Sequence, residues 1–297
     1  MRIAITGATG FLGRPITRHL HAIGWECIAV SRNPARADVP GANRVVTLDE
    51  LPECDAVLHL AGESVVGLWT PAKRRAILHS RVETTRALIA QMGALPRPPR
   101  VFLCASAVGW YGHRPGEILT EDSTPDPTRA FRWQVCDAWE RAAAEAEALG
   151  CRVVHLRFSN ALDPRGGFLG GLLPVYQRFG CWVLGNPQGA VSWIGMEDCA
   201  RMVGFALESE AIRGPLNVAA PNAITQQALA SGLAQSLGKR VVGRIPRALL
   251  RGALGEFSRA IVDDQRVVPA KAEALGFRWA FPAWRGWLQE GFVAVER

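Results

Sequence analysis

The chain has 297 residues, of which 48% are hydrophobic and 21% charged, an ordinary balance for a globular protein. No apolar run reaches the roughly 18–20 residues needed to cross a membrane, and the first residues form a strand and turn instead of a signal peptide; we expect a cytoplasmic protein with no membrane partner. The net charge of +7 comes from basic residues spread along the chain, which argues against a nucleic-acid partner and favours an anionic small-molecule cofactor or substrate.

Seven cysteines are scattered along the chain, and none belongs to a C-x-x-C pair or lies near clustered histidines. This pattern argues against a zinc site and against a disulfide framework. Most of the cysteines fall in apolar segments, which predicts buried, reduced thiols. We therefore expect no bound metal.

Short apolar strands alternate with helical patterns through the first two-thirds of the chain. Thr70 and Pro71 have the form of an N-cap and a first helical residue, and they open a long helix that runs to Met92. The strands are near-continuous apolar runs, as expected where helices cover both faces of a sheet. This alternation predicts an α/β protein with a Rossmann-type, doubly wound parallel sheet. The expected strands are 2–6, 26–31, 44–48, 55–62, 100–106 and 151–158, and the other expected helices are 11–24 and 128–149.

The pattern changes after residue 158, where glycines crowd residues 166–171. Helices are expected again near 225–237, 246–260 and 283–295. The chain is therefore predicted to form a Rossmann domain from residues 1–158 and 191–212, and a smaller C-terminal substrate lobe from residues 159–190 and 214–297.

Three glycines with the spacing G-x-x-G-x-x-G lie between the first strand and the first helix. The tight turn requires dihedral angles that glycine adopts easily, and a pyrophosphate must approach bare backbone. The start of the helix then offers free N–H groups and a partial positive charge. The position directly after a strand favours a dinucleotide site over a purely structural turn. The loop residues expected to contact the cofactor are Gly7, Thr9, Gly10, Phe11, Leu12 and Gly13.

The end of the second strand discriminates between the two nicotinamide cofactors. An NAD site typically places a carboxylate there to hold the ribose 2′-hydroxyl, whereas this chain has Ser31, Arg32 and Asn33. A guanidinium suits a 2′-phosphate by its charge and by its fork geometry. We therefore expect NADP(H) with these three residues on the phosphate, the alternative being that Arg32 is a solvated loop residue.

Several motifs resemble the extended and atypical short-chain dehydrogenase/reductases, and in particular the NAD-dependent epimerase/dehydratase family. The chain is most similar to the nucleoside-diphosphate-sugar epimerase subgroup that carries a C-terminal domain of unknown function. The resemblance covers nearly the whole chain. It is carried by TGATGFLG (6–13), HLAGES (59–64), SRVETT (80–85), SAVGWYG (106–112), DPRGGFLGGLLP (163–174), GAVSWIGMEDCA (189–200), GPLNVAAPN (214–222) and QRVVPAKAEALGF (265–277).

This resemblance implies a Rossmann domain that binds NADP(H) and a smaller lobe that binds substrate. Extended members often pair through two helices, which correspond here to residues 71–92 and 128–149, so a homodimer is expected. Matching the motifs by position adds further residues to the expected cofactor site: Leu60, Ala61, Gly62, Glu63, Arg81 and Ser106. For Arg81, an exposed position on the helix surface is the alternative.

The usual mechanism of this superfamily needs a Ser or Thr hydroxyl, a Tyr that transfers the proton and a Lys four residues later that lowers the Tyr pKa. Ser106 resembles the hydroxyl position, although Tyr111 then follows five residues later instead of four. The chain has no Tyr-x-x-x-Lys: its two tyrosines, Tyr111 and Tyr176, are followed four residues later by Pro115 and Gly180.

At the matching segment, Phe131 or Arg132 takes the Tyr place and Val135 or Cys136 the Lys place. Three explanations remain open. Tyr111 acts with Ser106 as the acid/base, its pKa lowered by Arg81 or by the nicotinamide; or a group of the substrate lobe, or of the substrate, moves the proton; or the chain binds NADP(H) without turning it over.

The leading interpretation is an enzyme, an NADP(H)-dependent oxidoreductase or epimerase-like protein acting on a small or nucleotide-linked carbonyl or hydroxyl compound. Ser106 and Tyr111 are the candidate catalytic residues. Arg157, at the end of the sixth strand, and Asn217 are expected to contact the substrate between the lobes. The alternative is a catalytically weak NADP(H)-binding regulatory protein, of the cell-division-inhibitor type.

Overall fold

A seven-stranded parallel sheet forms the centre of the computed structural model, which describes residues 1–292. The strand order is β12-β7-β5-β4-β1-β2-β3. The chain starts in the middle of the sheet, runs to one edge and then crosses to the other, so its direction of winding reverses between β1 and β4. The strands are β1 (Arg2–Thr6), β2 (Glu26–Val30), β3 (Arg44–Val46), β4 (Ala56–His59), β5 (Val101–Ala107), β7 (Arg152–Phe158) and β12 (Gly214–Val218).

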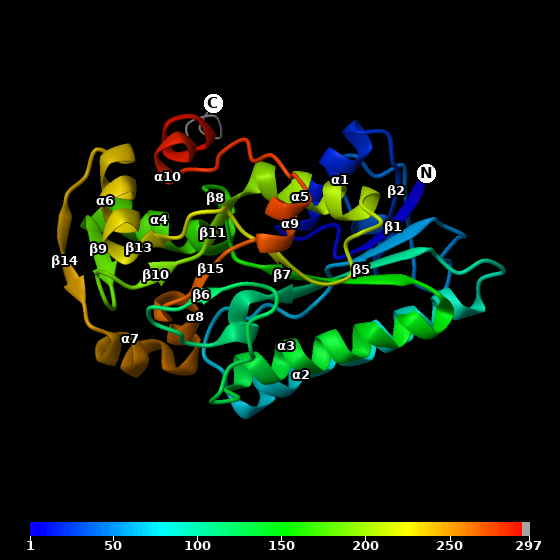
Figure 1. Ribbon diagram of the computed structural model, residues 1–297, viewed down its shortest axis with the longest axis horizontal. Helices are drawn as coiled ribbons and strands as arrows, with labels where there is room; N and C mark the ends of the chain where they lie inside the picture. Colours follow the sequence, from blue (N-terminus) through cyan, green and yellow to red (C-terminus); the bar gives the residue numbers. More distant parts are fainter. Residues whose placement is uncertain (293–297) are drawn as a thin grey trace.

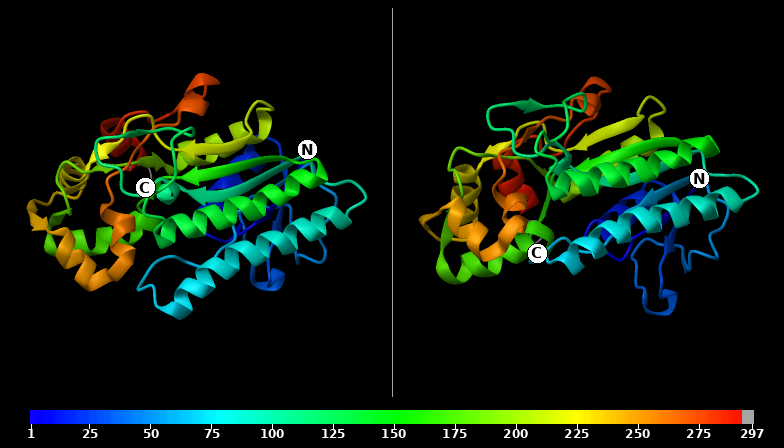
Figure 2. Two further views of the ribbon diagram at one scale, coloured as in Figure 1. Left: turned by 60° about the horizontal axis from the view of Figure 1, so that its bottom comes forward. Right: turned by 90° about the horizontal axis from the view of Figure 1, so that it is seen from below.

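Helices cover both faces of this sheet, which gives three layers (Figure 1). On one face α1 (Gly13–Ala22) packs beside α5 (Met196–Glu208), and on the other α2 (Pro71–Ala94) packs beside α3 (Phe131–Ala144). Figure 2 shows α2 and α3 running side by side across the same face. The predicted α/β fold with a Rossmann-type sheet is confirmed.

The long helix begins where the sequence predicts. Thr70 is the N-cap of α2, and its hydroxyl accepts a hydrogen bond from the N–H of Lys73 at 3.2 Å. The predicted helix 128–149 is shorter and changes type: α3 is followed by a 3₁₀ segment, Glu145–Leu149, that ends at Gly150 with φ 80°. Glycine accepts that left-handed conformation without a side-chain clash.

A second apolar core lies beyond the main sheet, in the region that holds the labels α4, α6 and β14 in Figure 1. Trp193, Trp284 and Trp287 pack against one another there, with ring centroids 5.3–5.9 Å apart. Short strand pairs surround this core instead of one large sheet. A separate apolar cluster holds Leu184, Leu250 and Val262. The elements of this part of the chain are β8 (Asn160–Asp163), α4 (Gly167–Phe179), β9 (Cys181–Leu184), β10 (Ala190–Val191), β11 (Trp193–Gly195), β13 (Ile224–Thr225), α6 (Gln226–Ser236), β14 (Val241–Ile245), α7 (Arg247–Leu254), α8 (Arg259–Val262) and α10 (Trp284–Gly286).

The predicted boundary of the smaller lobe at residue 214 is wrong. Residues 214–218 form β12, the edge strand of the main sheet, and α9 (Ala270–Ala274) packs against it, with Ala272 and Phe277 in the main core. The Gly-Pro pair at the start of this strand has the form of a turn, which hides the strand. The expected helix 246–260 breaks at Gly255. The expected helix 283–295 is α10 with one π-turn to Gly291, and residues 293–297 lie outside the described part of the chain.

Side chains cover the outer edge of β12. Lys271 donates from Nζ to the carbonyls of Arg213 (2.9 Å) and Pro215 (2.7 Å). Glu121, in the loop after β5, accepts the N–H of Asn217 at 3.0 Å. Between them Pro215 has no N–H to offer. Contacts from the rest of the chain therefore occupy the Pro215 carbonyl and the Asn217 N–H on the outer side of this strand. The remaining short strands, β6 (Ile118–Leu119) and β15 (Arg266–Val267), pair with each other, and the carbonyl of Val268, directly after β15, accepts from Asn217 Nδ2 of β12 at 3.0 Å.

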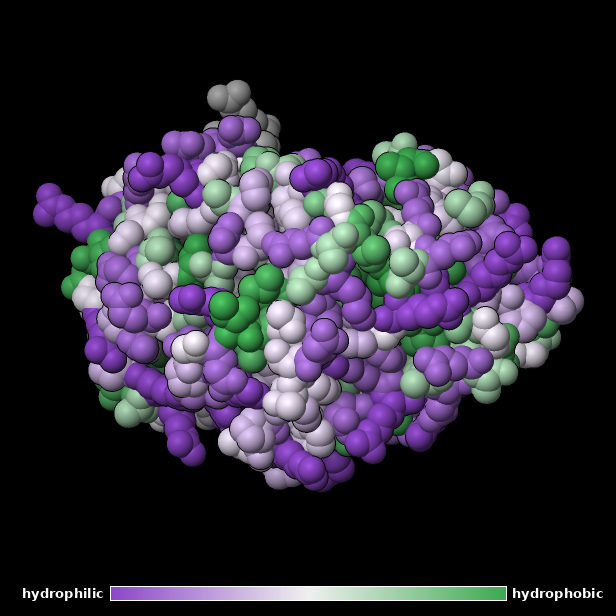
Figure 3. Space-filling model, in the orientation of Figure 1, coloured by the Kyte–Doolittle hydropathy of each residue, from purple (hydrophilic) through white to green (hydrophobic). Residues whose placement is uncertain are grey.

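The seven cysteines are all buried and unbridged, as their apolar surroundings predict. In residues 1–292 no group of three or more His, Cys, Asp or Glu side chains is placed to hold a metal ion. Within the same residues, no helix has both the length and the apolar character to cross a membrane. The face drawn in Figure 3 is mostly polar, with several separate apolar areas.

Candidate functional site

A cavity of about 730 Å³ opens at the carboxyl ends of β1, β2, β3 and β4. In doubly wound sheets ligands bind at this edge, where the winding direction reverses. Most of the expected cofactor residues meet here. The lining includes Gly7, Thr9, Gly10, Ser31, Arg32, Asn33, Leu60, Ala61, Gly62 and Glu63.

The glycine loop forms the floor of this cavity because larger residues do not fit. Gly7 has φ +71°, and a Cβ on it would lie 2.7 Å from the backbone nitrogen of Ala61. A Cβ on Gly13 would overlap the carbonyl oxygen of Gly7. Leu12, the N-cap of α1, supplies no capping side chain. At the start of α1 the N–H of Arg14 donates to the Gly10 carbonyl at 3.1 Å and Pro15 has no N–H, so the N–H groups of Leu12 and Gly13 are the ones left to bind an anion.

The far end of the cavity carries the residues expected on a 2′-phosphate. Ser31 and Arg32 follow β2, and the N–H of Asn33 donates to Ser31 Oγ at 3.2 Å, which folds this short loop. Arg32 is exposed, and none of the ion pairs formed within residues 1–292 uses it. Its guanidinium is therefore available to a ligand.

Several residues that line the cavity were not predicted. Thr47, Leu48 and Asp49 come directly after β3, and the end of a parallel strand is the signal that would have found them. A second group comes from α2 at helical spacing, which places its members on one face: Ser80, Thr84 and Leu88.

Arg81 lies between α2 and the loop after β4 and is not an exposed surface residue. Its Nη1 donates to the carbonyls of Glu63 (3.0 Å) and Ile77 (3.1 Å), and its guanidinium lies 4.8 Å from the ring centroid of Trp139. A Cβ on Gly62 would come within 3.1 Å of this guanidinium. Burial lowers the pKa of Arg81. The side chain holds the backbone that borders the cavity.

Phe11 faces a different hollow, of about 370 Å³, on the other side of the glycine loop. Its ring lies so close to Gly166 and Gly167 that a Cβ on either would contact it. These glycines begin α4, so the loop that binds the cofactor in related folds is packed directly against the smaller lobe.

The expected catalytic and substrate residues meet in a buried polar network. Ser106 donates to Glu140 Oε1 at 2.6 Å, and Arg157 binds both oxygens of Glu140 at 2.9 and 2.8 Å. Arg157 Nη1 donates to the Tyr111 hydroxyl at 3.0 Å, and that hydroxyl donates to Asn217 Oδ1 at 2.7 Å. Glu140 completes the network and was not predicted. Its signal is a lone carboxylate on an otherwise apolar face of α3.

Burial changes what Tyr111 can do. Its side chain is fully buried, and burial raises its pKa, with the charge of Arg157 opposing that shift. An acid/base role requires the opposite shift and a path to substrate. Arg81, the expected partner, contacts the loop after β4 instead. Ser106, Arg157 and Asn217 are likewise less than 4% exposed. Contact between these four residues and a substrate stays a prediction.

The sequence leaves two candidate residues at the place of the usual Tyr and two at the place of the usual Lys. The orientation of α3 distinguishes between them. Phe131 and Val135 pack into an apolar cluster with Ile77. Arg132 and Cys136 face the end of β5: Cys136 Sγ lies 3.6 Å from the Ala107 carbonyl. Burial raises the pKa of Cys136 to about 11, so this thiol stays protonated near neutral pH.

The fold, the glycine loop and the cavity together define a dinucleotide-binding protein of the Rossmann type. Residues 3–219 match the NAD dependent epimerase/dehydratase family, and residues 245–290 match a domain of unknown function, DUF1731. The chain therefore belongs to the NAD dependent epimerase/dehydratase family, as its motifs predict.

Two relatives match over almost their full length. The epimerase family protein YfhF of Bacillus subtilis is 34% identical over 288 residues, which cover 95% of this chain and 94% of that protein. The human epimerase family protein SDR39U1 is 33% identical over 296 residues, which cover 95% of this chain and 96% of that protein.

Solved structures agree with this assignment. Human SDR39U1 (isoform 2), crystallised with NADPH, is 28% identical, with a TM-score of 0.85 and coverage of 98% of each chain. A nucleoside-diphosphate sugar epimerase from Corynebacterium glutamicum is 31% identical, with a TM-score of 0.75, and covers 97% of this chain and 57% of its own.

Proposed function

We propose that this protein is an NADP(H)-dependent oxidoreductase or epimerase-like enzyme. Its substrate is a small or nucleotide-linked compound with a carbonyl or hydroxyl group. The main support is the cavity, which has a glycine loop at one end and an unpaired arginine, Arg32, at the other. The similar human protein crystallised with NADPH adds to this support.

The residues present fit this cofactor. Gly7 and Gly10 leave bare backbone for a pyrophosphate, and the uncapped start of α1 supplies N–H groups. Ser31, Arg32 and Asn33 can hold a 2′-phosphate through a guanidinium fork and two shorter polar groups. When bound, NADP(H) supplies the hydride chemistry. The chain itself binds and orients the cofactor.

Proton transfer is the part of the mechanism on which the chain departs from its superfamily. Tyr111 is buried, and Cys136 carries a raised pKa in place of the usual Lys. Two of the three explanations that the sequence leaves open allow turnover. Of these two, proton transfer by a group of the substrate lobe, or by the substrate itself, has better geometric support than proton transfer by Tyr111.

Paired binding measurements test the cofactor assignment. The wild type should bind NADPH at least about tenfold more tightly than NADH, because one charge-assisted contact contributes roughly 1.5–3 kcal/mol. Arg32→Ala should remove most of that preference and leave NADH binding unchanged. Arg36→Ala is the matched control, because Arg36 is exposed nearby and does not line the cavity. Equal or tighter NADH binding by the wild type would refute the assignment.

A second function has a specific observation behind it. Tyr111 is buried, and Arg132 and Cys136 lie at the end of β5, where the superfamily has its Tyr-Lys pair. This arrangement favours a protein that binds NADP(H) and signals through a protein partner. Turnover of any carbonyl compound or nucleotide sugar in a panel supports the enzyme. Tight NADPH binding without turnover, together with a partner captured by pull-down, supports the regulator.

A homodimer formed through α2 and α3 remains part of the proposal. Light scattering at several concentrations tests it, and a mass of one chain throughout would contradict it.

A further inference from the structure

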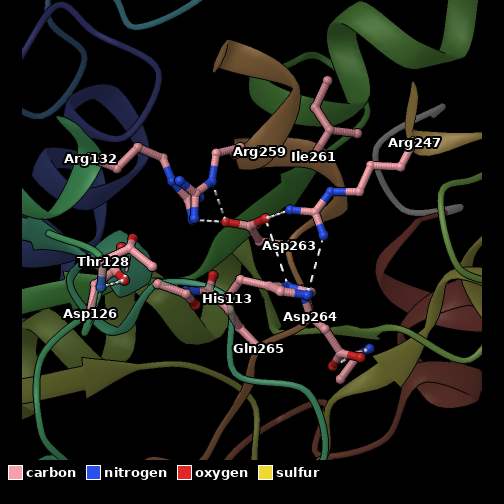
Figure 4. Close-up of polar contacts among 12 residues, drawn as sticks. His113, Asp126, Thr128, Arg132, Arg247, Arg259, Ile261, Asp263, Asp264 and Gln265 are labelled. Atoms are coloured by element: carbon pink, nitrogen blue, oxygen red, sulfur yellow. Dashed lines mark hydrogen bonds and ion pairs between the residues drawn. The ribbon is translucent and has the colours of Figure 1, made fainter. Parts of the chain in front are cut away.

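Three arginines and a histidine surround one buried carboxylate between the sheet and the smaller lobe (Figure 4). Asp263, whose side chain is 1% exposed, accepts from Arg132 at 2.5 Å, from Arg247 at 2.7 Å and from Arg259 at 3.3 Å. His113 Nδ1 lies 3.8 Å from the same carboxylate. These four groups come from α3, α7, α8 and the loop after β5. We call them the Asp263 cluster.

The positive charge of the cluster exceeds its negative charge. Three guanidinium groups share the single carboxylate of Asp263. The neighbouring carboxylate, Asp264, points away and accepts the N–H of Ala190 at 2.9 Å. Asp126, a further buried carboxylate whose charge acts on Arg132, accepts from the Thr128 hydroxyl at 2.7 Å. Three guanidinium groups that share one carboxylate keep donors in reserve, and these can bind a further anion.

Two further observations show donors of this cluster without an acceptor. Arg132 Nε is buried and has no hydrogen-bond partner within residues 1–292. His113 Nδ1 accepts the N–H of Asp264 at 2.9 Å, which leaves the ring proton on Nε2 in the neutral form. That Nε2 lies 3.2 Å from Arg247 Nη1. Two donors therefore face each other. Burial lowers the His113 pKa, the charge of Asp263 opposes that shift, and the charge of Arg247 adds to it.

The cluster lies where a substrate of this fold belongs. Arg132 stands over the end of β5, with its Cβ 3.5 Å from a Cβ built on Gly109. It precedes Cys136 by one helical turn, on the face of α3 that meets the carboxyl ends of the strands. Arg247 and Arg259 approach from the smaller lobe. Their side chains are 43% and 24% exposed, so solvent reaches this point.

We propose that the Asp263 cluster binds an oxyanion of the substrate, a carboxylate or a phosphate, with Arg132, Arg247 and His113 as its donors. This inference rests on the proposed function, and it names the substrate class: an acid whose charged group is held beside the end of β5. Asp263 is a positioning residue that keeps the guanidinium groups together before the anion arrives.

Calorimetric titration at constant ionic strength tests the proposal with three probes: malonate, inorganic phosphate and UDP. Arg247→Ala should weaken binding of the preferred probe at least about tenfold, because it removes a charge-assisted donor. Arg247→Lys keeps the positive charge but loses the forked guanidinium, so its affinity for the probe should lie between those of the wild type and Arg247→Ala. Arg86→Ala, which removes an exposed arginine of α2, is the control and should change nothing. NADPH affinity is measured for every protein.

The preferred probe identifies the source of the oxyanion: malonate for a free carboxylic acid, UDP for a nucleotide-linked phosphate. If no probe binds the wild type, or if Arg86→Ala and Arg247→Ala weaken binding equally, the proposal is overturned. Retained NADPH binding in that case leaves the proposed function standing. Failure to bind NADPH would refute the proposed function instead.

Discussion

The two ends of the sheet's carboxyl edge are built in opposite ways. At the β1–β4 end, the loops leave backbone N–H groups and the Arg32 guanidinium free around a cavity. At the β5–β12 end, the polar side chains form hydrogen bonds with one another and with Tyr111. They are Ser106, Glu140, Arg157 and Asn217. A ligand needs groups that the fold has left unsatisfied, so polar residues at a strand end are not by themselves a binding site.

The first prediction tests whether the β5–β12 end is structural. Arg157→Ala leaves the Glu140 carboxylate buried without its partner, so the free energy of unfolding should fall by about 3–5 kcal/mol. Arg141→Ala, on the same helix as Glu140 but exposed, should change it by less than about 1 kcal/mol. Urea unfolding measures both. Equal changes in the free energy of unfolding would mean that the buried Arg157–Glu140 pair stabilises the fold no more than the exposed pair does.

His59, at the end of β4, lies where the two ends meet, and burial lowers its pKa to about 3. Between pH 6.5 and about pH 3, His59 binds a proton in the unfolded chain but not in the folded chain, so the free energy of unfolding falls as the pH falls. His59 should contribute a slope of up to about 1.4 kcal/mol per pH unit.

Urea unfolding from pH 7 to pH 4 compares the wild type with His59→Gln. The variant should be less stable at pH 7 but should lose less stability on acidification, because it lacks the His59 contribution while the other buried histidine, His155, remains in both proteins. Parallel pH profiles would contradict the assignment of this effect to His59.

The next prediction concerns the open end. Gly13→Ala places a Cβ against the Gly7 carbonyl and displaces the loop, so NADPH affinity should fall about 100-fold. Gly171→Ala is the matched control, because a Cβ there meets nothing within 4 Å. Fluorescence titration with NADPH measures both, and a normal affinity for Gly13→Ala would place the cofactor elsewhere.

The smallest effect is expected at Tyr111. Tyr111→Phe removes one hydroxyl from a buried network and should cost about 1–2 kcal/mol of stability, with NADPH affinity and any turnover unchanged. Tyr176→Phe, which removes another buried hydroxyl, is the comparison. If Tyr111→Phe keeps its stability but loses turnover, the tyrosine transfers a proton after all.

Sequence patterns predicted the parts of the molecule that depend on local chemistry. The glycine loop, the strand ends and the Thr70 cap each follow from residues adjacent in the chain. The Asp263 cluster could not be predicted in this way, because Arg132 and Asp263 are 131 residues apart and only the packing of the lobes joins them. The network around Glu140 was missed for a related reason. Four of its residues were recognised singly and Glu140 was not, because nothing local shows that these side chains bond to one another.

The covered edge of β12 has a consequence for how copies of this protein meet. A bare outer strand invites a neighbouring molecule to add its own strand, and such additions lead to fibres. Here Lys271, Glu121 and a proline occupy the positions that an incoming strand would use. Lys271 of α9 and Glu121 therefore stand in the way of an added strand, and we expect a shortened chain that lacks residues 270–277 to lose part of that cover together with Ala272 and Phe277 of the core.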